Sequence, residues 1–164
     1  AEDGIRDYKV TGVQTCALPI CGRDIMALGY PLGARLGMVL KSSRGAIISE
    51  ADPELPMGGF LHSATTNGGN SGGPIVDQTG RLIGLVVAVT TRNFTENTYS
   101  IGIPTDQIWP FLKKHLPDLK PDTEERKALD WPDVDAKVSP GTVYIECVVK
   151  PQSPAEQDES ANPR

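Results

Sequence analysis

The sequence has no apolar run that approaches the roughly 18 residues of a membrane span, so we expect no transmembrane helix. It also lacks an excess of positive charge: 16 Lys and Arg stand against 21 Asp and Glu, a net charge of −5 that argues against nucleic-acid binding. Cysteine is scarce as well. Cys16, Cys21 and Cys147 have no metal-ligand spacing and cannot all pair within one chain, so neither a metal site nor a disulfide framework is expected. No cofactor is expected either.

The chain is rich in turn-forming residues. It contains 17 Gly and 14 Pro among 164 residues, while apolar residues make up only 38%. That much turn material disfavours a helical bundle and favours short strands joined by turns, which predicts an all-β fold. Residues 1–116 hold 10 acidic and 10 basic side chains, whereas residues 117–164 hold 11 and 6. A neutral body followed by an acidic segment is the simplest interpretation.

The first residues look unlike the rest. Ala1–Ile20 has no strand or helix periodicity, and no basic region followed by an apolar one as in a signal peptide. Ala1–Asp7 and Val10–Ile20 can be back-translated into the two constant parts of a common short-read sequencing adapter. We therefore interpret residues 1–21 as an adapter-derived artefact that replaces upstream coding sequence, and we exclude them from fold reasoning.

From residue 22 the pattern becomes strand-like. Short apolar runs alternate with Gly, Pro and Asn-rich turns, as is typical of strands in an antiparallel sheet. The expected strands are Asp24–Gly29, Met38–Ser49 (bulged at Gly45), Phe60–Ala64, Pro74–Val76, Arg81–Val89 and Thr98–Ile103. A helix should follow, with Thr105 as its N-cap and Pro117 ending it.

The chain is thereby divided into two parts after the artefact. Residues 22–118 are predicted to form one domain, and residues 119–164 an acidic linker or tail. Within the tail, Leu119–Lys137 is compatible with a short helix, and Val143–Val149 with one extra strand.

The string that carries chemistry is Asn67–Pro74, which reads NGGNSGGP. A serine hydroxyl becomes a useful nucleophile only when a base removes its proton, and the oxyanion then formed must meet preorganised donors. Backbone N–H groups can serve as those donors when the loop turns sharply before the serine, and glycine permits such a turn without steric cost. The string therefore predicts an exposed nucleophile, Ser71, in a tight loop.

Residues 22–116 resemble the second β-barrel of a trypsin-like (chymotrypsin-fold) serine protease, nearest the HtrA type. Four segments carry the resemblance, in the family's order: Ala27–Gly33, Gly69–Pro74, Gly80–Gly84 and Ser100–Pro104. The resemblance implies a six-stranded antiparallel barrel with a closing C-terminal helix, from which the first barrel is missing. A weaker likeness, of Lys137–Ile145 to the opening strand of such a first barrel, does not outweigh the linker interpretation.

The resemblance also assigns roles. Ser71 is the implied nucleophile, and the backbone N–H groups of Gly69 and Ser71 are the implied oxyanion hole. The implied substrate is a polypeptide, which would pair with the backbone of Val87-Ala88-Val89. The implied specificity pocket carries no charge and so favours a small or aliphatic side chain, and its lining residues are Thr65, Thr66, Asn67, Val89 and Ile101.

Two parts of the catalytic triad have no counterpart in this sequence. His62 and His115 are the only histidines, and neither matches the family's histidine, which lies in the first barrel together with the aspartate. We therefore expect a fragment of a serine endopeptidase that is inactive alone. The alternatives are a pseudoprotease or a peptide-binding barrel without catalysis. The family implies an exported or periplasmic location, and the oligomeric state stays open.

Overall fold

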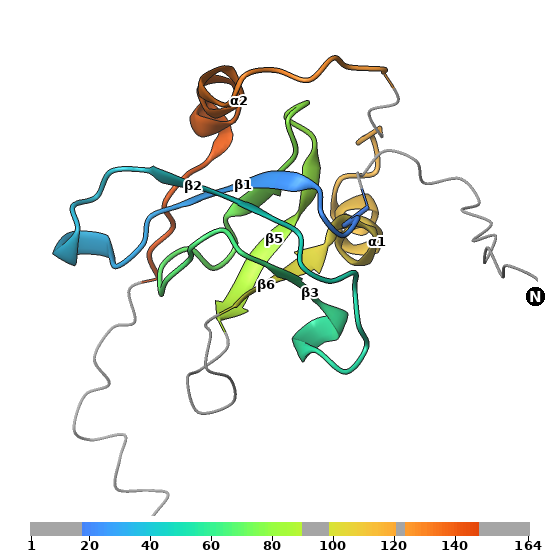
Figure 1. Ribbon diagram of the computed structural model, residues 1–164, viewed down its shortest axis with the longest axis horizontal. Helices are drawn as coiled ribbons and strands as arrows, with labels where there is room; N and C mark the ends of the chain where they lie inside the picture. The colour runs from blue at the N-terminus through green and yellow to red at the C-terminus, as the bar shows by residue number, and fades with distance from the viewer. Residues whose placement is uncertain (1–17, 90–98, 121–123, 148–164) are drawn as a thin grey trace, which may run out of the picture.

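The computed structural model describes residues 18–89, 99–120 and 124–147, and within them six strands form one antiparallel sheet (Figure 1). The strand order is β2-β1-β4-β5-β6-β3. The strands are β1 (Asp24–Gly29), β2 (Lys41–Ala46), β3 (Phe60–His62), β4 (Pro74–Val76), β5 (Leu82–Val89) and β6 (Ser100–Pro104). The expected all-β class is confirmed.

The sheet curls so that its two edges meet. A bridge pairs Ile47, just after β2, with His62 at the end of β3. Backbone hydrogen bonds from Ile48 to Leu61 (2.8 Å) and from Ser63 to Ala46 (3.0 Å) extend this seam. Because the seam satisfies groups that an open edge would leave unpaired, the sheet becomes a barrel.

The pairing differs from the sequence expectation at Gly45. The register of β1 with β2 runs without a shift from Asp24↔Ala46 to Gly29↔Lys41, so there is no bulge. A Cβ at Gly45 would instead collide with the backbone of Ala64, so glycine is required there for close packing. Register shifts lie elsewhere, between Val86 and Ala88 in the pairing of β5 with β6 and between Ile75 and Val76 in the pairing of β4 with β5.

The barrel interior is filled by side chains from almost every strand. Ile25 of β1, Phe60 of β3, Ile75 of β4 and Ile83 of β5 are completely buried. Each fully buried aliphatic or aromatic side chain contributes roughly 1.5–3 kcal/mol. Successive positions of β1 are buried on both faces, since Ile25 and Ala27 belong to the barrel core while Met26 and Leu28 pack against Val134.

The helix that follows the barrel is α1 (Thr105–His115), as expected. Its N-cap is Pro104, however, because the Thr105 hydroxyl donates to the Leu82 carbonyl oxygen (3.1 Å) and so ties the helix to β5. The helix ends at His115, and its C-cap, Leu116, stands immediately before Pro117. No helix within the described part of the chain is long and apolar enough to cross a membrane.

The acidic segment returns to the barrel rather than leaving it. A second helix, α2 (Trp131–Val138), buries Val134 completely against Met26, Leu28 and Val76. The 3-10 turn η3 (Ser139–Gly141) then leads into residues 142–147, which form no strand, and residues 148 and 149 of the expected strand lie outside the described residues. Two further 3-10 turns are η1 (Gly33–Arg35) and η2 (Pro56–Gly58).

Candidate active site

The loop between β3 and β4 carries Ser71 on a tight double turn. The Asn70 N–H donates to the Asn67 carbonyl (3.0 Å), and the Gly73 N–H donates to the Asn70 carbonyl (2.9 Å). Gly69 and Gly72 have φ of +100° and +82°, in the left-handed region that favours glycine. The loop is thus bent sharply on both sides of Ser71.

Two glycines are also required because backbone passes close by. A Cβ at Gly69 would lie 2.5 Å from the Tyr30 carbonyl oxygen, and one at Gly73 would collide with the Leu28 carbonyl oxygen. The Leu32 N–H adds a hydrogen bond to the Gly68 carbonyl (2.7 Å). The end of β1 and the residues that follow it therefore pack directly against the backbone of the serine loop.

Ser71 itself is exposed, and its hydroxyl donates to the Val87 carbonyl oxygen (3.1 Å). Among the residues that the structure describes, the backbone N–H groups of Gly69 and Ser71 donate to no partner. Two unused donors beside an exposed hydroxyl are the arrangement that an oxyanion hole requires. The serine loop therefore carries an exposed hydroxyl and two backbone N–H groups that have no described acceptor.

A pocket of about 110 Å³ opens on one side of Ser71. It contains four of the residues expected to bind substrate and two further ones: Thr66, Asn67, Ala88, Val89, Gly68 and Val86. Thr66 is buried, and its hydroxyl donates to the Ser100 hydroxyl (2.8 Å). Among the residues that the structure describes, none that lines this pocket is charged.

Three expected substrate residues lie beside this pocket rather than in its lining. Thr65 is exposed, and its N–H donates to the Ser43 hydroxyl (2.9 Å). Val87 offers its carbonyl to Ser71, and Ile101 is buried in β6 opposite Ala88. Their contacts link the segments that border the pocket to neighbouring parts of the barrel.

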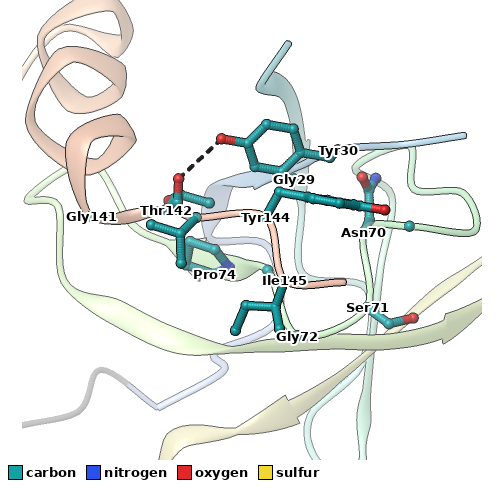
Figure 2. A pocket seen from close by; sticks show the side chains of 13 residues that line it. Gly29, Tyr30, Asn70, Ser71, Gly72, Pro74, Gly141, Thr142, Tyr144 and Ile145 are labelled. Carbon is teal, nitrogen blue, oxygen red and sulfur yellow. Dashed lines mark hydrogen bonds between the residues drawn. The ribbon is translucent and has the colours of Figure 1, made fainter. Parts of the chain in front are cut away.

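A second pocket, of about 450 Å³, lies on the other side of the serine loop (Figure 2). Residues 69–74 form one side of it and residues 141–145 the other, with Gly29 and Tyr30 between them. Sequence reasoning missed this wall, since residues 141–145 lie about seventy positions from Ser71 and carry no motif. Only the docking of α2 brings them there.

The histidines do not supply a base to this site. His62 is completely buried in the core beside Phe60, with ring centroids 5.9 Å apart, and neither ring nitrogen has a hydrogen-bond partner. Burial lowers the pKa of His62 to about 4. His115 lies on α1 with its ring against Phe111 (4.5 Å). Neither histidine lines either pocket beside Ser71.

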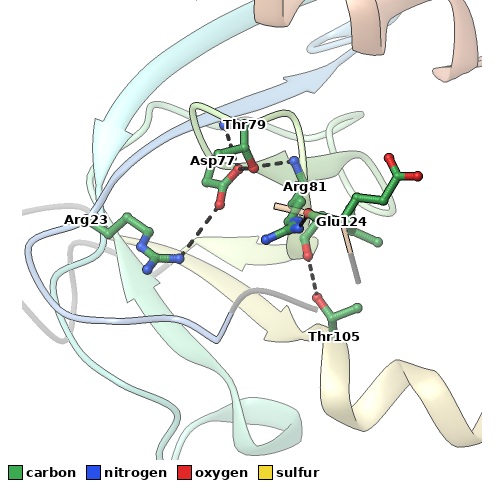
Figure 3. A network of polar contacts seen from close by, with 7 residues as sticks. Arg23, Asp77, Thr79, Arg81, Thr105 and Glu124 are labelled. Carbon is green, nitrogen blue, oxygen red and sulfur yellow. Dashed lines mark hydrogen bonds and ion pairs between the residues drawn. The ribbon is translucent and has the colours of Figure 1, made fainter. Parts of the chain in front are cut away.

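The buried carboxylate of the barrel has a structural task (Figure 3). Asp77 accepts hydrogen bonds from the Thr79 N–H (2.8 Å), the Thr79 hydroxyl (2.6 Å) and the Arg81 N–H (3.1 Å), and its second oxygen pairs with Arg23 at 3.7 Å. These bonds fix the turn between β4 and β5. Over the described residues, no group of three or more His, Cys, Asp or Glu side chains could hold a metal ion.

Comparison with known proteins finds a matching family and several similar chains. Residues 6–85 match the family described as the Trypsin-like peptidase domain. The curated "Serine protease HtrA-like" of Staphylococcus aureus is 30% identical over 128 residues, which cover 73% of this chain. The solved structure "HtrA-type protease AlgW with decapeptide" has a TM-score of 0.53 at 24% identity and covers 63% of this chain and 33% of that one. The serine endoprotease from Yersinia pestis has a TM-score of 0.49 at 25% identity, covering 62% and 34%.

The fold and the serine loop define a chain of the trypsin-like class. In sequence the chain is similar to HtrA-like serine proteases, and its likeness to the AlgW structure, at 24% identity, shows the fold alone. It spans 16% of the length of the curated relatives that it matches. The family match begins at residue 6, inside the segment that we interpret as adapter-derived, and that interpretation stays a prediction.

Proposed function

We propose that the barrel of residues 22–118 is the nucleophile-bearing half of a serine endopeptidase. The Ser71 oxygen would bond to the carbonyl carbon of a peptide, a base would take the hydroxyl proton and return it to the leaving amine, and an acyl-enzyme would remain on Ser71. The N–H groups of Gly69 and Ser71 would stabilise the oxyanion. The observation that carries this proposal is the exposed Ser71 hydroxyl beside two backbone donors that have no other described partner.

The proposed substrate is a polypeptide that adds a strand to β5. On the serine side the backbone of β5 bonds to Gly72 and Gly73 as far as Val86. Because β5 continues to Val89, we expect Val87-Ala88-Val89 to offer the peptide its edge, with the peptide replacing the contact between the Ser71 hydroxyl and the Val87 carbonyl. A peptide on that edge would place one side chain in the 110 Å³ pocket, around which Thr65, Thr66, Asn67 and Ile101 are arranged. An uncharged pocket of this size favours a small or aliphatic side chain.

The proposed activity needs a base that the described residues do not supply. His62 is enclosed in the core and His115 lies on α1, so the histidine and the aspartate of a triad would have to come from another barrel. We therefore expect residues 22–164 to be inactive alone.

Fluorophosphonate labelling tests this proposal. A fluorophosphonate reports a serine that a base has activated, so we expect no label on Ser71 of the isolated chain, as in a Ser71→Ala control. Rapid labelling of Ser71 would contradict the expected inactivity. Labelling of Ser71 in a longer chain that includes a histidine and an aspartate at triad spacing would support the endopeptidase.

One observation favours the second candidate, a peptide-binding barrel without catalysis. The Ser71 hydroxyl donates to the Val87 carbonyl oxygen, so its hydrogen points at β5 rather than at a base. If the longer chain binds peptides on β5 but never labels at Ser71, this second function replaces the first.

A further inference from the structure

Ser71 stands between two pockets, and the proposed function uses only one of them. The smaller pocket, beside Val86, Ala88 and Val89, receives the side chain that precedes the scissile bond. The larger one, about 450 Å³, lies between the serine loop and residues 141–145. Ser71 is the one residue that lines both pockets.

The far wall of the larger pocket is held in place by specific contacts. The Tyr30 hydroxyl donates to the Thr142 carbonyl oxygen (3.2 Å), and the rings of Tyr30 and Tyr144 meet edge to face with centroids 5.7 Å apart. Upstream, the buried Val134 fastens α2 to the barrel. The chain is therefore held to the barrel both before η3, through Val134, and after it, through Thr142 and Tyr144.

The far wall of this pocket is apolar, whereas the serine loop lines it with backbone and polar groups. Among the residues that the structure describes, none that lines the pocket is charged, and Figure 2 shows Tyr144 and Ile145 next to the serine loop, with Ile145 close to Gly72. Ile145 is 84% exposed and Tyr144 is 42% exposed. Apolar side chains that face an open pocket gain free energy when a ligand removes them from water.

We propose that the larger pocket takes the part of a peptide on the leaving-group side of the scissile bond, and that Tyr144 and Ile145 select an apolar side chain there. This inference rests on the proposed function. A peptide with its preceding side chain in the smaller pocket and its carbonyl at Ser71 must continue past Ser71, where the larger pocket begins. Specificity on that side is thus supplied by a segment outside the barrel.

Peptide binding to the full 164-residue chain tests the proposal without requiring catalysis. The probes are fluorescein-labelled peptides with Val before the scissile bond and either Leu or Asp after it, and the dissociation constant is measured by fluorescence anisotropy. We expect the Leu peptide to bind about tenfold more tightly, because part of the leucine side chain becomes buried. Replacing the preceding Val by Lys tests the smaller pocket separately.

Ile145→Ser should reduce the preference for the Leu peptide over the Asp peptide to less than twofold. The control Ile48→Ser, at another exposed isoleucine, should keep that preference at about tenfold.

If replacing the preceding Val by Lys weakens binding but the Leu and Asp peptides bind equally, the larger pocket is not a subsite, and the proposed function stands. If no peptide binds and no preference for the preceding residue is found, both proposals fail.

Discussion

His62 occupies the barrel core as a neutral imidazole. Burial lowers its pKa from 6.5 to about 4. Between pH 4 and pH 6.5 this histidine is therefore mostly protonated in the unfolded chain and mostly neutral in the folded chain. Stability should therefore be unaffected above pH 6.5 and should fall as the pH drops from 6.5 towards 4. The total loss is roughly 3 kcal/mol.

Urea unfolding at pH 7.5, 5.5 and 4 measures this effect. In His62→Leu the part of the pH dependence that comes from this site should disappear, and His115→Gln, at an exposed histidine, should behave like the parent chain. An identical pH dependence in His62→Leu and the parent would show that His62 is not protonated on unfolding.

Adjacent glycines of the serine loop should respond differently to alanine. Gly69 has φ of +100°, and a Cβ there would lie 2.5 Å from the Tyr30 carbonyl oxygen, whereas a Cβ at Gly68 would meet no atom within 4 Å. Gly69→Ala should lower the free energy of unfolding by about 2 kcal/mol or more, while Gly68→Ala should be close to neutral. Thermal unfolding of both variants measures the difference, and equal losses would refute this account of the loop.

The tight turn of the serine loop follows from its local sequence, while the roles assigned to its residues stay predictions. One turn requires glycines on both sides of Ser71, and all of these residues lie within eight consecutive positions, so the local sequence is enough to predict the turn. Tyr144 and Ile145 could not be predicted in this way, because their place beside Ser71 depends on the docking of α2 through Val134. Long-range packing of this kind leaves no signal in residue spacing.

The strands illustrate the same distinction at the level of elements. β1 and β4 have the predicted bounds, because turn residues mark both ends of each. β2 is shorter than its apolar pattern suggests, because its ladder with β1 begins only at Gly29↔Lys41. The length of a strand depends on which residues of the neighbouring strand pair with it, and the sequence of one strand alone does not specify that pairing.

The docking of α2 should depend on one side chain. Val134 is fully buried against Met26, Leu28 and Val76, so Val134→Ala removes methyl groups from a packed contact and should cost about 2 kcal/mol. Because α2 lies at the margin of the fold, the loss should appear as local opening. Hydrogen exchange of the α2 amides should accelerate about 30-fold, which is 2 kcal/mol expressed as an equilibrium constant.

Ala136→Lys, at an exposed position of the same helix, is the matched control. Exchange in β4 and β5 should stay unchanged in both variants. If Val134→Ala accelerates exchange equally in α2 and in the barrel, the two form a single cooperative unit, and α2 does not open separately.

At the scale of the whole molecule, apolar side chains remain uncovered next to the first strand. Leu32, Leu36, Met38 and Val39 are 42–69% exposed, on η1 and the residues that flank it. Exposed apolar groups of this kind promote association. We expect the chain to self-associate as its concentration rises, which sedimentation velocity measures.

The double change Leu36→Ser with Val39→Ser should shift the chain towards monomer. Met57→Ser, at an equally exposed residue of η2, should not. A monodisperse monomer at every concentration would contradict this prediction.

The central claim is that Ser71 lies in a preformed site and lacks only a base. Fluorophosphonate labelling of the isolated chain, with and without added imidazole as a soluble base, tests it most directly. We predict labelling of Ser71 that appears only with imidazole and exceeds that of Ser42, an exposed serine of β2 that lies outside the serine loop. Rapid labelling of Ser71 without imidazole, or equal labelling of Ser71 and Ser42 with it, would contradict the account.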